Sequence, residues 1–322
     1  MISNKPLPKW LKDYIFGELG AEEKPDPKEF CKNLDSDHDK NRIYLGTYFP
    51  RSFAESFCIH NNLFSYAPYK QTMEIKEKMK ILSFGCGTGG DVVGLVCAIA
   101  TMLPMVNEIE IVAYDGNSIA IDHLGDILRL DPLNKRFNIR QRCVPISISS
   151  VEDLTHITSN IGNEYDFILS FKFVNELMQL GILGRDGFQI LAEKLSPLLA
   201  MDGLMTLLDV RAEYCGEWQP KNLNMGMGRF CRGGLFATLL PIPCHFRGSS
   251  NCDSCFSDKR FTGSFTSKDL VTYRVLGHKA FIDSIYPSCK LNVTYIRNKD
   301  GMDDPCPLLN GTNVLDAFDI NN

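Results

Sequence analysis

Short hydrophobic runs alternate with longer amphipathic segments through the middle of the chain. Five runs rich in β-branched and aromatic residues predict strands, at residues 80–84, 109–114, 137–144, 166–170 and 204–210. The segments between them carry apolar residues at helical spacing, which predicts helices at 91–102, 118–130, 151–160 and 188–199. This alternation predicts a parallel, doubly wound α/β sheet of the Rossmann-like kind.

The N-terminal part of the chain does not follow this alternation. Apolar residues at helical spacing occur around 8–19 and again at 51–64. The polar segment 20–42 between them predicts a long loop. We therefore expect residues 1–75 to form a helical cap on the α/β core.

The C-terminal third is of a different composition again. Residues 216–322 are rich in Gly, Pro and Cys, and they contain one strand-like segment at 271–276. We expect a core at 76–215, followed by a cysteine-rich, basic extension at 216–322 that completes the sheet.

Composition narrows the class of protein. The chain has 322 residues, of which 44% are hydrophobic and 23% charged, and this excludes a disordered chain. Its 12 cysteines are too dilute for a small disulfide scaffold. The N-terminal segment lacks the pattern of a signal peptide, and the longest apolar run, 92–106, is too short to cross a bilayer. We expect a cytoplasmic protein with reduced thiols and no membrane partner.

Charge is distributed unevenly along the chain. The net charge is −5, yet residues 221–300 carry 12 Lys or Arg against 5 Asp or Glu. A basic stretch in an acidic protein favours an anionic partner such as RNA. A solvated surface with no partner explains the same charges.

A glycine-rich motif lies between the first predicted strand and the first predicted core helix. It reads Phe84-Gly85-Cys86-Gly87-Thr88-Gly89-Gly90. Glycines let the chain turn sharply and let a ligand approach the backbone, and the helix N-terminus behind them favours an anionic group. The spacing of Gly85, Gly87 and Gly90 also satisfies the dinucleotide-binding pattern. A purely geometric turn is the alternative.

An acidic residue ends the second predicted strand. Asp115, followed by Gly116, is in the position from which a carboxylate accepts both hydroxyls of a ribose. Nicotinamide dinucleotides and S-adenosylmethionine (SAM) both use this geometry.

The glycine motif resembles motif I of class I SAM-dependent methyltransferases, and residues 165–170 and 198–205 look like that family's fourth strand and the segment after it. The resemblance implies a Rossmann-like methyltransferase fold and a SAM site. Its implied cofactor-binding residues are Gly85, Cys86, Gly87, Thr88, Gly89, Asp115, Gly116 and Ser170. Many family members carry an acid at the position of Ser83, where it contacts the methionine amino group, so here that group must be held otherwise.

Three polar residues follow the fourth predicted strand, where the family places the acceptor. Lys172, Asn175 and Glu176 are therefore the candidate catalytic residues for orienting an acceptor in an in-line methyl transfer. The alternative is that Lys172 and Glu176 form a surface ion pair one helical turn apart.

A cysteine cluster forms the second motif. Cys252 and Cys255 are spaced as C-x-x-C, and Cys244 lies eight residues upstream, so the three predict a metal site. The fourth ligand is left open among Cys231, His245, Cys289 and Cys306, and zinc and an iron–sulfur cluster both suit thiolates. The alternatives are scattered free thiols and, for Pro243-Cys244, a catalytic nucleophile. Cysteines in predicted elements or in the glycine loop, namely Cys58, Cys86, Cys97 and Cys143, are expected to be packed.

The order of segments carries a remoter resemblance. A Tyr/Arg-containing segment at 48–54, motif I, Val174-Asn175-Glu176-Leu177 and the cysteine segment are similar in order to a methyltransferase-like family associated with assembly of the small ribosomal subunit. That resemblance implies a cysteine-bound iron–sulfur cluster and contact with ribosomal RNA.

Three function hypotheses remain. The first is SAM-dependent methyl transfer to an unidentified acceptor, with RNA slightly favoured. The second is a catalytically silent scaffold of the same fold, bound to RNA or a ribosomal partner. The third is an NAD(P)-dependent oxidoreductase.

The aromatic residues Tyr44, Tyr48, Phe49, Phe53 and Phe57 are either a lid over the cofactor or the core of an N-terminal helix.

Overall fold

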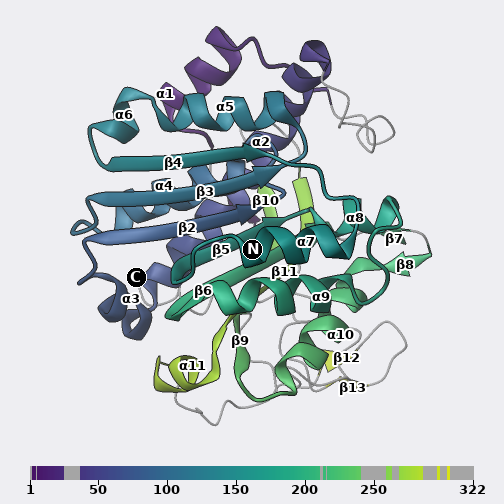
Figure 1. The fold of residues 1–322 in the computed structure, drawn as a ribbon. Helices are drawn as coiled ribbons and strands as arrows, with labels where there is room; N and C mark the ends of the chain where they lie inside the picture. The colour runs from purple at the N-terminus through teal and green to yellow at the C-terminus, as the bar shows by residue number, and fades with distance from the viewer. Residues whose placement is uncertain are drawn as a thin grey trace.

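The fold is organised around one large sheet (Figure 1). The computed structural model describes residues 2–4, 6–24, 37–210, 213–214, 216–240, 259–262, 268–285, 296–297 and 303–304. Five parallel strands form its centre, in the order β4-β3-β2-β5-β6. They are β2 (Lys78–Phe84), β3 (Glu108–Asp115), β4 (Asn138–Pro145), β5 (Tyr165–Phe171) and β6 (Leu199–Val210). All five predicted strands are confirmed.

The sheet continues beyond β6 with strands from both ends of the chain. Strand β11 (Lys268–His278) runs antiparallel to β6 and contains the predicted segment 271–276. It also pairs with β9 (Phe236–Leu240) and with β10 (Lys259–Thr262). Strand β1 (Ile2–Asn4) pairs with β10, so the beginning of the chain joins the sheet next to its C-terminal third.

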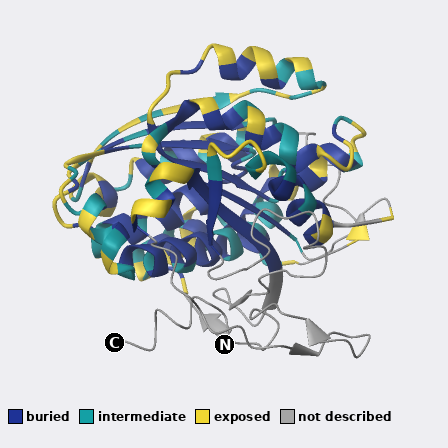
Figure 2. Ribbon diagram, turned by 90° about the horizontal axis from the view of Figure 1, so that it is seen from below, coloured by how far each residue is buried: buried dark blue, intermediate teal, exposed yellow. Residues whose placement is uncertain are grey.

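Helices cover both faces of the sheet (Figure 1). One face carries α2 (His38–Ser65), α4 (Gly90–Met102) and α5 (Ser118–Leu128), whose buried residues share one hydrophobic cluster. The other carries α7 (Val151–Ser159), α8 (Val174–Gln179), α9 (Gly187–Leu195) and α10 (Gln219–Cys231), which share a second cluster. Figure 2 shows the strands as a buried layer between them. The doubly wound, Rossmann-like α/β fold is thus confirmed.

Shorter elements complete the described structure. They are α1 (Lys9–Lys12), a π-helical segment (Asp13–Glu18), α3 (Ala67–Met73), α6 (Asp131–Asn134), a 3₁₀ turn (Ser196–Leu198), β7 (Glu213–Tyr214), β8 (Glu217–Trp218), α11 (Lys279–Ile285), β12 (Ile296–Arg297) and β13 (Asp303–Asp304). None of the described helices is long and apolar enough to cross a lipid bilayer.

Helix α2 begins far earlier than its sequence pattern indicates. The loop predicted for 20–42 is wrong at its end, because the helix starts at His38 and not near residue 51. Asp37 caps it by accepting hydrogen bonds from the backbone N–H groups of Asp39 and Lys40. Pro50 lies inside the helix and is buried. A proline usually ends or kinks a helix, so its presence inside α2 is unusual.

Helix α10 and strand β9 are among the elements after β6 that the sequence did not predict. Helix α10 packs on α9, and strand β9 follows it at the edge of β11. Gly226 and Gly228 inside α10 weaken its helical pattern in the sequence. Tertiary packing overrides that preference: a Cβ at Gly226 would lie only 3.0 Å from the backbone N of Gln189 on α9.

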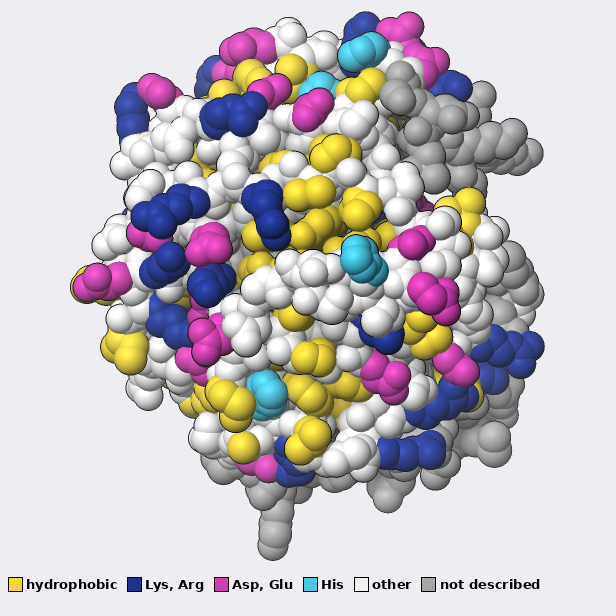
Figure 3. Space-filling model, in the orientation of Figure 1, with side chains coloured by type: hydrophobic (Ala, Val, Ile, Leu, Met, Phe, Trp, Pro, Cys, Tyr) yellow, Lys and Arg dark blue, Asp and Glu magenta, His cyan; other side chains and the backbone are white. Residues whose placement is uncertain are grey.

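Basic side chains around β4 lie among acidic ones on the surface (Figure 3). Arg129 pairs with Asp126, and Lys135 pairs with Asp131. The guanidinium of Arg136 donates to the carbonyl oxygens of Leu103, Pro104 and Val106. These contacts indicate a solvated, internally compensated surface around β4.

Candidate active site

The order in which successive strands are added to the central sheet reverses between β2 and β5. Helix α4 leads from β2 to β3 on one side, whereas β5 lies on the other side of β2. In open α/β sheets, ligands bind outside the carboxyl ends of the strands at such a switch point. A cavity of about 310 Å³ opens at this position. Its volume lies within the range of small-molecule sites, roughly 300–1,000 Å³.

The glycine motif forms the turn from β2 into α4 beside this cavity. Gly85, Gly87 and Gly89 have φ angles of 68°, 51° and 79°, a region that favours glycine. A Cβ at Gly85 would lie 2.3 Å from the ring of Phe173, and one at Gly87 would lie 2.8 Å from the Tyr44 hydroxyl. The glycines are therefore required both by conformation and by space.

The predicted cofactor residues of the loop divide into two groups. Gly85, Cys86 and Thr88 line the cavity. Gly87 and Gly89 are not among its lining residues, and they shape the turn instead. The Cys86 thiol is buried, and this burial raises its pKa well above the ordinary value, so it remains a neutral thiol.

Asp115 joins the end of β3 to the glycine loop. One carboxylate oxygen accepts a hydrogen bond from the Gly87 N–H at 2.7 Å, and the other accepts from the Asn117 N–H at 2.8 Å. Burial raises the pKa of Asp115, while these N–H donors lower it. Asp115 and Gly116 both line the cavity, so the remaining lone pairs of the carboxylate are available to ribose hydroxyls.

Helix α2 covers the glycine loop and supplies one wall of the cavity. Tyr44 and Tyr48 line it, with ring centroids 5.0 Å apart, whereas Phe49, Phe53 and Phe57 belong to the hydrophobic core. The aromatic run therefore divides between the wall of the cavity and the hydrophobic core. Asn117 donates to the side-chain oxygen of Asn41 at 2.7 Å, which ties the far side of the loop to α2.

Lys172 lies at the carboxyl end of β5, where an acceptor was expected. Its Nζ lies 2.6 Å from the carboxylate of Glu55 on α2, and Glu55 is fully buried. The pairing predicted between Lys172 and Glu176 is wrong, because the backbone directs Lys172 toward α2 instead. Lys172 has a φ of 60°, which is unusual for a residue with a side chain and concentrates at functional sites.

Asn175 is fixed by a second buried acid. Its backbone N–H and its side-chain NH₂ both donate to the carboxylate of Asp209 on β6, at 3.0 and 2.5 Å. Its side-chain oxygen accepts from Gln179. Burial raises the pKa of Asp209 to about 6, although the contacts with Asn175 and the charge of Lys172 lower it. Asn175 lines the cavity, but its amide is already engaged by the protein.

Glu176 is the candidate catalytic residue that points into the cavity without a described ion-pair partner. Its side chain is exposed to the cavity, while the surrounding protein limits its solvation. That burial among protein atoms, with the charges of Asp115 and Asp209 nearby, raises the pKa of Glu176 to about 8. Such a carboxyl is poised to exchange a proton near neutral pH.

Ser170 and the metal-ligand candidates are not among the described residues that line the cavity. Ser170 is buried inside β5 and is not among the cavity-lining residues. Cys244, Cys252 and Cys255 lie outside the described residues, as do Cys289 and Cys306. Within the described part of the chain, no three His, Cys, Asp or Glu side chains lie close enough to hold a metal ion. Cys58, Cys97 and Cys143 are partly buried and Cys86 is buried, all in one hydrophobic cluster, as predicted.

Sequence reasoning missed three acids that shape this site. Glu55, Asp91 and Asp209 come from α2, α4 and β6. Glu55 and Asp209 meet Lys172 and Asn175 only through the tertiary fold. Asp91 differs from them, because it directly follows the glycine motif in the sequence. The signal that was available for Asp91 is its place one residue after Gly90.

Comparisons with known proteins find only distant structural similarity. No family model matches the chain, and no curated protein sequence matches it. Among solved structures it is similar to the plantazolicin methyltransferase BpumL in complex with S-adenosylhomocysteine (SAH), with 20% identity, 62% of this chain and 57% of that chain covered, and a TM-score of 0.32.

Two further solved structures are similar at the same level. One is a TehB-like SAM-dependent methyltransferase from Corynebacterium glutamicum, with 15% identity, 67% of this chain and 88% of that chain covered, and a TM-score of 0.32. The other is the [4+2]-cyclase SpnF, with 12% identity, 71% of this chain and 70% of that chain covered, and a TM-score of 0.34. Likeness this distant carries no argument about activity, and the fold itself rests on the strand order.

Proposed function

We propose that this chain is a SAM-dependent methyltransferase. The observation that carries the proposal is the pairing of Asp115 with the glycine turn: Gly87 donates to the carboxylate, and both border one cavity at the switch point of the sheet. An adenosine ribose on Asp115 would place the rest of the ligand along Gly85, Cys86 and Thr88. SAM would supply an electrophilic methyl group there.

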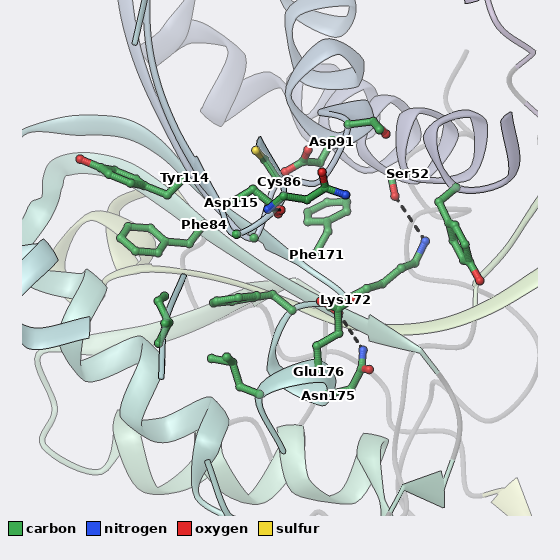
Figure 4. A pocket seen from close by; sticks show the side chains of 18 of the residues that line it. Ser52, Phe84, Cys86, Asp91, Tyr114, Asp115, Phe171, Lys172, Asn175 and Glu176 are labelled. Atoms are coloured by element: carbon green, nitrogen blue, oxygen red, sulfur yellow. Dashed lines mark hydrogen bonds between the residues drawn. The ribbon is translucent and has the colours of Figure 1, made fainter. Parts of the chain in front are cut away.

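The residues at the other end of the cavity suit an acceptor. Figure 4 shows Lys172, Asn175 and Glu176 on the side of the cavity opposite Asp91, Cys86 and Asp115. In the proposed reaction the acceptor lone pair forms a bond to the methyl carbon while the carbon–sulfur bond breaks. The electron pair of that bond would stay on the sulfur, and ionised Glu176 would take the acceptor proton. Lys172 and Asn175 hold the shape of this end through their contacts with Glu55 and Asp209.

Calorimetry tests the cofactor assignment. We expect SAM and SAH to bind with one site per chain, and Asp115→Asn to weaken both. Binding of NAD alone, or unchanged SAM binding by Asp115→Asn, would overturn the proposal in favour of an oxidoreductase or an unrelated ligand.

A catalytically silent scaffold is the second candidate. Two of the three predicted catalytic residues, Lys172 and Asn175, are engaged by buried acids of the protein itself, which favours a structural role for them. A chain that binds SAM but methylates no RNA or protein fraction under single-turnover conditions would support this candidate.

RNA is the acceptor that we propose for the active enzyme. The support is the excess of 12 Lys or Arg over 5 Asp or Glu in residues 221–300. Transfer of labelled methyl groups from SAM to small-subunit ribosomal RNA tests it. RNA binding should weaken steeply with salt, because phosphate contacts release counterions.

A metal site at Cys244, Cys252 and Cys255 is a separate proposal that rests on their spacing alone. Metal analysis and a visible absorption spectrum of anaerobically purified protein distinguish zinc from an iron–sulfur cluster. Cys252→Ser with Cys255→Ser should abolish the metal, and a metal content near zero in the unaltered chain would reject the site.

A further inference from the structure

Asp91 is a buried acid whose hydrogen bonds are incomplete. It lies in the first turn of α4, directly after the glycine loop, and only 1% of its surface is exposed. One carboxylate oxygen, Oδ2, accepts a hydrogen bond from the Ser83 hydroxyl at 2.7 Å. The other, Oδ1, is buried and accepts no well-formed hydrogen bond from the described residues, although the backbone N–H groups at the start of α4 lie close enough to lower the pKa of the carboxyl. A buried carboxylate oxygen left in this way is costly, so it indicates a missing donor.

The missing donor can come from the cavity. Asp91 is one of the residues that line it, together with Gly85 and Thr88 of the glycine loop. Figure 4 shows Asp91 beside Cys86 and Asp115, on the glycine-loop side of the site. The backbone around it is fixed as well, because the carbonyl oxygen of Asp91 accepts from the Ser56 hydroxyl on α2 at 2.6 Å. A ligand that fills the cavity therefore meets the Asp91 carboxylate in a position fixed by these hydrogen bonds.

The charge around the site favours a cationic donor. Three acids line the cavity, Asp91, Asp115 and Glu176. Two cations also line it: Lys172 is held by Glu55, and the guanidinium of Arg51 lies over the Tyr48 ring, 5.7 Å from its centroid. Burial raises the pKa of Asp91 to about 6, even though the Ser83 hydroxyl and the backbone at the start of α4 lower it. An ammonium group placed against Oδ1 would restore the charged state and satisfy the oxygen.

We propose that Asp91, oriented by Ser83, binds the α-ammonium group of the amino-acid part of the cofactor. SAM and SAH carry this one hydrogen-bonding cation, because a sulfonium centre donates no hydrogen bond. Ser83 occupies the position near the end of β2 where an acid would stand. The carboxylate is supplied instead by Asp91, eight residues later, in the first turn of α4. The inference rests on the proposed SAM site and assigns one group of the ligand within it.

The test compares ligands that differ only in the amino-acid part. SAH carries the ammonium and the carboxylate, decarboxylated SAH keeps only the ammonium, and 5′-methylthioadenosine lacks both. We expect Asp91→Asn to weaken SAH and decarboxylated SAH roughly ten- to hundredfold, as for the loss of a charged hydrogen bond. Binding of 5′-methylthioadenosine should stay within about twofold, because its ribose and base do not touch Asp91.

Two further variants separate orientation from binding. Ser83→Ala should weaken SAH by a smaller factor and leave 5′-methylthioadenosine unchanged. Asp115→Asn, which alters the ribose site, should weaken both ligands together. This contrast also detects misfolding, because a damaged site would lose 5′-methylthioadenosine as well.

The outcomes distinguish the inference from the proposed function. If the unaltered chain binds neither SAH nor 5′-methylthioadenosine, the SAM site itself is wrong. If the unaltered chain binds SAH tightly and Asp91→Asn binds it equally well, the SAM site stands and the role of Asp91 is refuted.

Discussion

Lys172 at the end of β5 and Glu55 in the middle of α2 form an ion pair between the sheet and the helix that covers it. The side chain of Glu55 is fully buried and that of Lys172 is 15% exposed, so the pair is largely removed from water. Removing one partner of such a pair leaves an uncompensated buried charge. The fit of α2 over the cavity therefore depends on this contact.

Lys172→Met should lower the free energy of unfolding by about 3–5 kcal/mol, the cost typical of a broken buried pair. Chemical denaturation measures this change. Lys135→Met is the matched control, because Lys135 and Asp131 are 77% and 80% exposed and such pairs contribute about 1 kcal/mol or less. Adding Glu55→Leu to Lys172→Met should recover much of the loss. Equal effects of the two lysine substitutions would contradict a buried pair.

The backbone at Lys172 leads to a second prediction. Because its φ is 60°, Lys172→Gly should be more stable than Lys172→Ala by roughly 1 kcal/mol, although both lose the ion pair. Glu164, with a φ of 65°, provides the control at an exposed position. Glu164→Gly should stabilise the chain by a similar amount, roughly 1 kcal/mol, in thermal or chemical unfolding. No difference between the Gly and Ala variants at 172 would show that the backbone relaxes freely.

Gly85→Ala tests the close packing of the glycine turn. Its Cβ would lie 2.3 Å from the Phe173 ring, so either the loop or the ring must move and the cavity must change shape. We expect SAM affinity to fall at least tenfold by calorimetry, about 1.4 kcal/mol or more. Gly181→Ala is the control: its φ is 72°, but no atom lies within 4 Å of the added Cβ, so only stability should fall. Unchanged SAM binding by Gly85→Ala would show that the glycine turn does not shape the ligand site.

The pH dependence of methyl transfer tests Glu176. A base must be ionised, and the pKa of Glu176 is raised to about 8. The value of kcat/KM should therefore rise with pH and level off above about 8, and Glu176→Gln should remove this rise and lower the plateau. A profile that Glu176→Gln leaves unchanged would exclude Glu176 as the base.

The same shift makes stability depend on pH. The folded chain holds the Glu176 proton more tightly than the unfolded chain, whose carboxyl titrates near 4.5. Its contribution to stability is thus fully present below pH 4.5 and declines as pH rises toward about 8. Denaturation across this range should show a shallower decline for Glu176→Gln than for the unaltered chain. A decline of the same slope in both would place the raised pKa elsewhere, for example on Asp209.

The strands of the core could be predicted because each is a compact apolar run with a glycine or polar boundary. The glycine turn and Asp115 were found for the same reason, since both are local patterns at strand ends. The start of α2 could not be found, because Pro50 interrupts the helical pattern while Asp37 caps the helix well upstream. Helix propensity is a weak guide where packing decides.

The partners of the site residues lay beyond any local pattern. Lys172 pairs with Glu55 across 117 positions, and Asn175 bonds to Asp209 across 34. Residue types and spacing indicated that Lys172, Asn175 and Glu176 cluster after β5, but not which of them the protein itself engages. Only the tertiary fold leaves Glu176 facing the cavity.

The insertion of β11 between β6 and β9 has a consequence for synthesis of the chain. Within the described part of the chain, the side of β6 away from β5 pairs with residues 271–277, so those residues must leave the ribosome before this side is covered. Until then the nascent chain presents an open, apolar strand edge beside the parallel strands β4-β3-β2-β5. Such edges promote aggregation, so the nascent chain is most exposed to aggregation in the interval before β11 pairs with β6.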